Sequence, residues 1–154
     1  MSITIKFPNQ EIDCGYFRFK FLRDSIAKKI PHKGFKEVLK LRDDYLAEYM
    51  FCFSEEKKKQ KKVFCDDLNK KINDIDYLAN ADATEEEKKY LNLFQKFFWA
   101  SDCEAKMSAS VAKAIWHYIE DMEDDFEINN YDTFQDFKSE IEECVNKNKG
   151  FEWY

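Results

Sequence analysis

The sequence predicts a mainly α protein, a compact bundle of about five to six helices in a single domain that spans residues 1–154. Only 3 glycines and 2 prolines occur in the chain, whereas a sandwich or barrel of many short strands needs more of these turn-forming residues. Aromatic residues make up 17% of the chain, and their large side chains can close a core without disulfides or metals. The charged fraction of 36% is high, but so many aromatic residues argue against a disordered chain.

The chain opens with a short segment of alternating character at residues 2–7. Its odd-numbered residues are apolar and its even-numbered residues are polar, which predicts a half-buried strand that Pro8 ends. A lone strand is marginally stable and needs a partner. The aromatic segment 150–154 also follows a glycine, so we expect the short N-terminal strand to pair with this C-terminal segment.

The pattern becomes helical after Gly15. Apolar residues then recur at steps of three and four, at Phe19, Leu22, Ile26 and Ile30. Residues 16–21 also alternate, so a strand is the rival interpretation there, but the continuation to Ile30 favours a helix. Pro31 ends this helix, and His32 follows in a turn where we expect it to be exposed.

A second helix is predicted over residues 34–54, where apolar residues form one stripe. The lysine-rich stretch 57–62 comes next. It predicts either a solvated linker or the polar start of a third helix that runs to Ile75. The lysines could also contact phosphate, but no aromatic residues are interleaved with them, so a solvated face is favoured. Residues 80–83 are expected to form a loop.

Three further helices are predicted in the rest of the chain. Thr84 and Glu87 have the spacing of a capping box, and the helix that they start continues through the aromatic residues near Phe98. The next helix is expected over residues 108–122. The last is expected to begin at Asp132, whose spacing to Gln135 also fits a capping box.

Charge is distributed unevenly along a chain whose net charge is −6. Residues 1–100 carry 20 lysines and arginines against 17 aspartates and glutamates, a balance of +3. Residues 101–154 carry 5 against 14, a balance of −9. An acidic half repels phosphate backbones and attracts basic surfaces. We therefore expect a basic protein partner and no nucleic acid.

The five cysteines stand far apart, and none has the short two-ligand spacing of a zinc motif. No secretory leader pattern opens the sequence, and no apolar run approaches the roughly 18–20 residues of a membrane span. Reduced thiols in a cytoplasmic protein are the simplest expectation, with no metal, no other cofactor and no membrane partner.

Two segments carry a resemblance. Residues 15–27 read GYFRFKFLRDSIA, and residues 99–105 read WASDCEA. In this order they resemble the GYxxFxxLRxxIA-like opening and the (H)SDC(D/E)-like central turn of a loose group of uncharacterised small bacterial proteins. The sequence departs from that group, because no histidine precedes Ser101 and Ala105 stands where the group has glycine. The resemblance implies no known activity.

The turn at residues 99–104 is one candidate site. Its side chains could line a small-molecule or metal site, and they are Trp99, Ser101, Asp102, Cys103 and Glu104. A reactive cysteine needs a neighbouring base or a helix N-terminus to lower its pKa, and no base is close in sequence. The favoured interpretation is therefore structural: Ser101 or Asp102 caps the following helix, and Cys103 packs inward.

The acidic run at residues 120–127 is the other candidate site. The segment that starts at Asp121 does not match the pattern of a calcium-binding loop. Phe126 stands where that loop needs glycine, and Asp132 stands where it needs glutamate. A solvated helix end is the plain interpretation, and attraction of a basic partner is the functional one. The partner-binding residues would be Asp121, Glu123, Asp124, Asp125 and Glu127.

The sequence thus favours a small acidic cytosolic protein-binding protein, immunity-like or inhibitor-like, that uses an acidic surface to engage a basic partner. The alternative is a small-molecule or metal-binding protein with its site at the turn 99–104. No catalytic residues are predicted, and an enzyme is the less favoured class.

Overall fold

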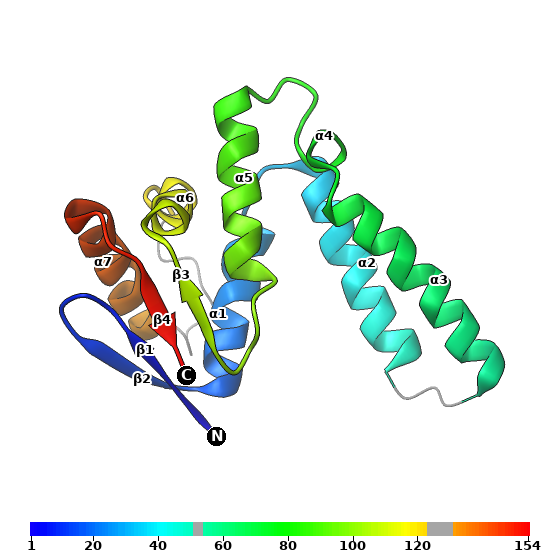
Figure 1. Cartoon of the computed structure of the whole chain (residues 1–154), viewed down its shortest axis with the longest axis horizontal. Helices are drawn as coiled ribbons and strands as arrows, with labels where there is room; N and C mark the ends of the chain where they lie inside the picture. The colour runs from blue at the N-terminus through cyan, green and yellow to red at the C-terminus, as the bar shows by residue number, and fades with distance from the viewer. Residues whose placement is uncertain (51–53, 123–130) are drawn as a thin grey trace. The chain divides into compact units, whose positions relative to one another are not determined.

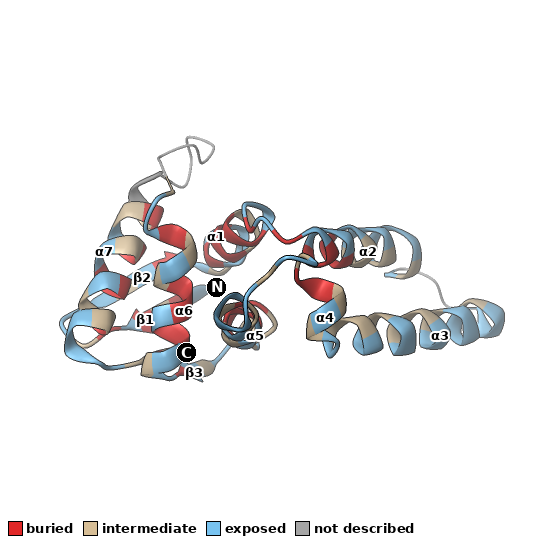
Figure 2. Ribbon diagram, turned by 90° about the horizontal axis from the view of Figure 1, so that it is seen from above, coloured by how far each residue is buried: buried red, intermediate tan, exposed pale blue. Residues whose placement is uncertain are grey.

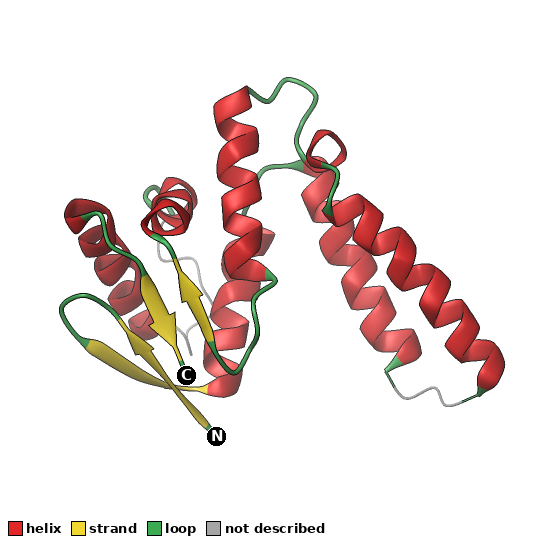
Figure 3. Cartoon of the chain, in the orientation of Figure 1, coloured by secondary structure: helices red, strands yellow, loops and turns green. Residues whose placement is uncertain are grey.

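The computed structural model describes residues 1–50, 54–122 and 131–154, and within these ranges the protein is mainly α, as predicted. Seven helices and four short strands lie in the described ranges (Figures 1 and 3). Contacts divide the chain into two compact units, one made of residues 1–29 and 89–154 and the other of residues 30–88. The single domain that the sequence suggests stays a prediction.

The first unit holds a four-stranded antiparallel sheet in the order β2-β1-β4-β3. Its strands are β1 (Ser2–Lys6), β2 (Glu11–Gly15), β3 (Ala105–Met107) and β4 (Phe151–Trp153). Ile5 of β1 lies opposite Trp153 of β4, so the predicted pairing of the two ends is confirmed (Figure 1). The sequence did not predict β2 or β3, because such short segments carry too little alternation to stand out.

One face of this sheet is apolar and the other is charged. The apolar face is buried and carries Ile3, Ile5, Cys14, Met107, Phe151 and Trp153. On the other face Lys6 lies opposite both Glu11 and Glu152, and Lys106 also lies opposite Glu152. Opposite charges on directly paired strand residues attract each other. The charged face of the sheet is therefore compatible with solvent, while the apolar face covers the core.

Four helices complete the first unit: α1 (Tyr16–Lys28), the part of α5 (Glu85–Phe98) after Lys88, α6 (Ala109–Ile119) and α7 (Tyr131–Lys147). The helical interpretation of residues 16–21 is confirmed. Helix α6 is capped by Ser108, whose Oγ accepts a hydrogen bond of 3.2 Å from the amide of Val111. The side chain of Asp132, expected to cap the last helix, lies outside the described residues.

Aromatic rings form the centre of this unit. Phe97 of α5 is fully buried, and its ring centroid lies 5.8 Å from Phe137 of α7, 6.1 Å from Phe151 and 6.1 Å from Trp153. Figure 2 shows the buried residues on the inner sides of α1, α5, α6 and α7. The Phe97 ring of α5 therefore connects α7 with the C-terminal strand β4 in the core.

The second unit contains α2 (Lys33–Tyr49), α3 (Glu55–Ile72), α4 (Ile75–Leu78) and the first residues of α5. The lysine-rich stretch 57–62 lies inside α3, so it starts a helix and is not a linker. The predicted capping box of α5 is confirmed. The amide of Glu87 donates to Thr84 Oγ1, and the amide of Thr84 donates to Glu87 Oε2, both at 3.1 Å.

The expectation that His32 is exposed was wrong, because its side chain is only 5% exposed. Its Nδ1 accepts a hydrogen bond of 3.2 Å from the amide of Asn80. The Asn80 side chain in turn donates to the Pro31 carbonyl at 2.8 Å and accepts from the Lys33 amide at 2.9 Å. The loop after α4 therefore folds over the start of α2, which a reading of neighbouring residues cannot reveal.

Candidate functional site

The acidic run is only partly described. Asp121 is exposed just after α6, whereas Glu123, Asp124, Asp125 and Glu127 lie outside the described residues. Glu120 is the C-cap residue of α6 and is exposed. Negative charge at a helix C-terminus is disfavoured by the helix dipole, so these two acids carry a local electrostatic cost.

The turn at residues 99–104 is held by Ser101. Its Oγ accepts hydrogen bonds from the amides of Cys103 at 3.2 Å and Glu104 at 3.4 Å, and its carbonyl accepts one of 3.1 Å from Trp153 Nε1. Ser101 thus satisfies free amides, as expected. The expected helix cap was wrong, however, because the strand β3 follows the turn.

Asp102 is committed to an ion pair with a buried arginine. Its Oδ1 pairs with Arg23 of α1, and its Oδ2 accepts a hydrogen bond of 3.0 Å from the Tyr16 hydroxyl. Lys20 Nζ lies 3.6 Å from the same Oδ2. The hydrogen bond to Asp102 raises the pKa of Tyr16 above its ordinary value. Both carboxylate oxygens therefore already have partners, which leaves little capacity to bind a ligand.

Arg23 is 3% exposed and lies among three aromatic rings. Its guanidinium carbon is 5.1 Å from the centroid of Phe19, 6.0 Å from Phe97 and 5.4 Å from Trp153. It also donates to the carbonyls of Phe97 at 3.3 Å and Ala100 at 3.2 Å. Burial lowers the pKa of Arg23, while the carboxylate of Asp102 opposes that effect. The arginine thus fixes the turn to α1.

The sequence reasoning missed Arg23 and Tyr16. Arg23 lies on the apolar stripe of α1, next to Leu22 and four residues after Phe19, and all three are buried. An arginine on an apolar stripe is rare unless it is paired, so its position was the signal that could have revealed the ion pair.

The remaining residues of the turn do not converge. Trp99 is half-buried and donates through Nε1 to Gln95 Oε1 at 3.3 Å. Cys103 and Glu104 are exposed, so the expectation that Cys103 packs inward was wrong. Among the described residues no three His, Cys, Asp or Glu side chains lie close enough together to hold a metal. The ligand site at this turn stays a prediction.

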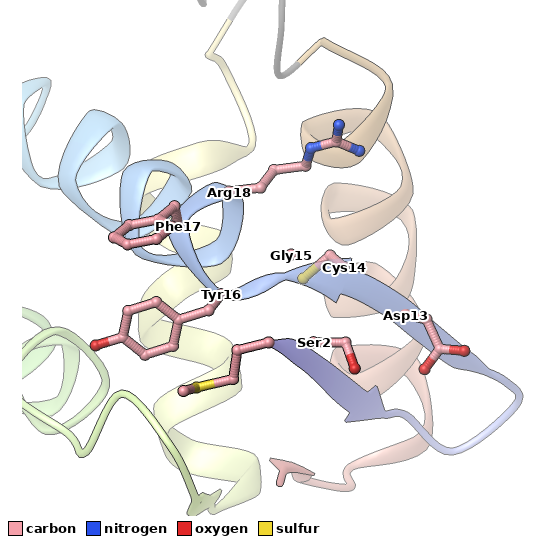
Figure 4. Close-up of a pocket in the computed structure, with 8 residues that line it drawn as sticks. Ser2, Asp13, Cys14, Gly15, Tyr16, Phe17 and Arg18 are labelled. Atoms are coloured by element: carbon pink, nitrogen blue, oxygen red, sulfur yellow. The ribbon is translucent and has the colours of Figure 1, made fainter.

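A shallow cavity of about 470 Å³ opens beside the end of β2 and the start of α1. In Figure 4 the charged groups of Asp13 and Arg18 lie apart from each other and do not point toward one another. Burial raises the pKa of Cys14, whose side chain is 6% exposed, so the thiol stays protonated near neutral pH. Since no polar groups converge and the cysteine is not activated, this cavity has no arrangement for nucleophilic chemistry.

Cys144 of α7 provides a prediction about pH. Its side chain is fully buried, and burial, with the charges of Glu140 and Glu143, raises the pKa of its thiol to about 11 from the ordinary 9.0. The unfolded chain therefore loses this proton at a lower pH than the folded protein does. We expect the free energy of unfolding, measured by urea denaturation, to fall by up to about 2 kcal/mol between about pH 9 and pH 11.

Replacing the thiol separates this effect from the titration of lysines. Cys144→Ala should flatten the decline over the same pH range, whatever the variant loses in overall stability. Cys65→Ala, which removes a half-buried cysteine of α3, is the matched control and should leave the decline unchanged. Equal pH profiles for wild type and Cys144→Ala would contradict the assignment.

Comparisons with known proteins yield no relative: no family model, no curated protein and no solved structure matches the chain. The resemblance of residues 15–27 and 99–105 to a loose group of bacterial proteins stays a prediction. Within the described part of the chain, none of the helices has the length and apolar character needed to cross a membrane.

Proposed function

We propose that the protein is a small acidic protein-binding protein that engages a basic partner through the acidic segment around the end of α6 and the start of α7. The observation that carries the proposal is a charge pattern. Residues 114–137 contain eight aspartates and glutamates and not one lysine or arginine. A long segment of one sign raises the local potential and attracts surfaces of the opposite sign. An immunity-like or inhibitor-like role in the cytoplasm fits this chemistry.

Exposed carboxylates of the described residues support the proposal. Glu120 and Asp121 at the end of α6 are exposed, and so are Asp136 and Glu142 of α7. The nearest lysine in α7, Lys138, donates to the Met122 carbonyl at 3.3 Å, so its hydrogen bond goes to the backbone and not to a carboxylate. Within the described ranges none of these four acids forms an ion pair, so their charges are available to a partner protein.

The test is a charge-reversal variant in the full-length protein. Changing Asp121, Glu123, Asp124 and Asp125 to lysine should reduce capture of basic proteins from a cell lysate by roughly tenfold or more. The captured proteins are identified by mass spectrometry, and their isoelectric points are compared with those of the whole lysate. Capture should also weaken as salt concentration rises.

A control variant makes the same charge change elsewhere. It replaces four exposed acids that form no ion pair among the described residues, which are Asp44, Asp66, Asp82 and Glu104. Capture of basic partners should persist in this control, and both variants should keep the melting temperature of the wild type within a few degrees. If the wild type and the 121–125 variant captured equal amounts of basic proteins, the proposal would be wrong.

A further inference from the structure

The hairpin of α2 and α3 in the second unit leaves much of its surface uncovered. Helix α3 has 18 residues, and none of them is buried. The buried residues of α2 all lie in its first half, and they are Gly34, Phe35, Val38 and Leu39. Figure 2 accordingly shows α3 only in the colours of intermediate and exposed residues. Helices in proteins gain most of their stability by packing an apolar face, and in α3 the apolar side chains are only partly covered.

Aromatic rings lie where α3 meets the second half of α2. The Phe64 centroid is 5.7 Å from Tyr45 and 5.8 Å from Tyr49, and the two tyrosines are 5.7 Å apart. All three side chains are only half-buried. This cluster packs α2 and α3 against each other. Part of the apolar surface of its three rings remains exposed to water.

A groove of about 580 Å³ follows the open side. Its described lining is Tyr49 of α2 with Lys59, Gln60, Val63, Phe64 and Asp67 of α3, and we call it the α3 groove. Val63 in this groove is 70% exposed, so its apolar side chain is open to water. The groove therefore offers an apolar floor and a polar rim, which is the usual arrangement of a helix-binding surface.

The unneutralised charge on this rim is positive. Asp67 pairs with Lys71 at 3.1 Å, so its own charge is largely offset. Lys59 and the neighbouring Lys62 are exposed and form no ion pair within the described residues.

We propose that the α3 groove binds an acidic amphipathic helix of a partner protein. Apolar side chains of that helix would cover Tyr49, Val63 and Phe64, and its carboxylates would face Lys59 and Lys62. This goes beyond the function proposed above, because it uses the other unit and a partner of the opposite charge.

Single-stranded nucleic acid fits the groove less well. Base stacking needs free ring faces, but Tyr45 stacks on Phe64, and the amines of Lys57 and Lys61 lie 5.7 Å and 5.8 Å from the centroids of Tyr49 and Tyr45. A peptide needs only an apolar contact surface and cations at its edge, and both are present.

The test is direct binding of defined peptides to the full chain, measured by fluorescence anisotropy. The probe is a labelled helical peptide of about 15 residues with leucines at i, i+3, i+4 and i+7 and glutamates at the other positions. We expect binding that weakens as salt rises, with at least about tenfold lower affinity for the same peptide with lysines in place of glutamates. A labelled oligonucleotide is titrated in parallel.

Substitutions of exposed residues test whether the peptide binds in the α3 groove. Because these side chains are exposed, we expect the variants to fold. Val63→Asp and Lys59→Glu should each weaken the peptide by about tenfold. Asn69→Asp and Lys70→Glu make the same charge changes at exposed positions of α3 outside the groove, and they should bind as wild type does.

Three results would overturn the proposal. The first is equal affinity for the acidic and basic peptides, or no binding of either. The second is tighter binding of the oligonucleotide. The third is a dimer of the free protein in light scattering that Val63→Asp dissociates, because the groove would then hold a second copy. None of these results depends on the acidic segment, so this proposal and the proposed function can fail separately.

Discussion

Trp153→Ala is expected to destabilise the first unit by about 3–5 kcal/mol, the largest effect that we predict for a single substitution. The Trp153 side chain is 1% exposed. Its ring packs edge-on against Phe19 with centroids 5.1 Å apart, and its Nε1 donates to the Ser101 carbonyl at 3.1 Å. Truncation would therefore leave a cavity among aromatic rings and an unpaired carbonyl at the same time.

The measurement is urea denaturation followed by circular dichroism, with Tyr154→Ala as the matched control. Tyr154 is 56% exposed and lies next to Trp153, so its truncation should cost less than about 1 kcal/mol. The two variants differ by one position in the same short tail. Similar unfolding free energies for both would contradict the central place that we assign to Trp153.

Asp102→Ala is expected to cost about 2–4 kcal/mol, because it leaves the charge of Arg23 in the core without its carboxylate. Arg23 is 3% exposed, and removing one partner of a buried ion pair is far more harmful than removing both. We place the effect below the full range for buried pairs, because the Asp102 side chain keeps 31% exposure to water.

A double-mutant cycle checks the cause of this loss. Arg23→Met combined with Asp102→Ala should be clearly less destabilising than the sum of the two single variants. Glu104→Ala, an exposed acid of the same turn, is the control and should change the unfolding free energy by less than about 0.5 kcal/mol. Strict additivity would show that Arg23 and Asp102 do not act as a pair.

Local patterns predicted several elements because their causes lie within a few residues. The alternation of residues 2–7 predicted β1, and Pro8 predicted its end. The spacing of Thr84 and Glu87 predicted the start of α5, since the side chain of each residue accepts a hydrogen bond from the backbone amide of the other. The pairing of β1 with β4 was also predicted, because a lone strand needs a mate and the sequence offers few candidates.

Residues whose environment depends on distant segments were misjudged. His32 looked like an exposed turn residue until Asn80, from a loop 48 positions later, closed over it. Cys103 looked like a core residue because the turn was expected to open a helix, but a strand follows and the side chain faces water. Asp102 looked available to a ligand, although Arg23 from a helix 79 positions earlier already binds it.

The sequence by itself determined the helical class, the periodicity of the long elements, the two ends that meet in one sheet and the acidic character of the last third of the chain. These properties follow from side-chain spacing and charge, which act along the chain. Only the tertiary structure decided that Asp102 neutralises Arg23 and that α3 buries none of its residues. Burial and ion pairing depend on which segments meet in space, and that is settled by packing across long separations in sequence.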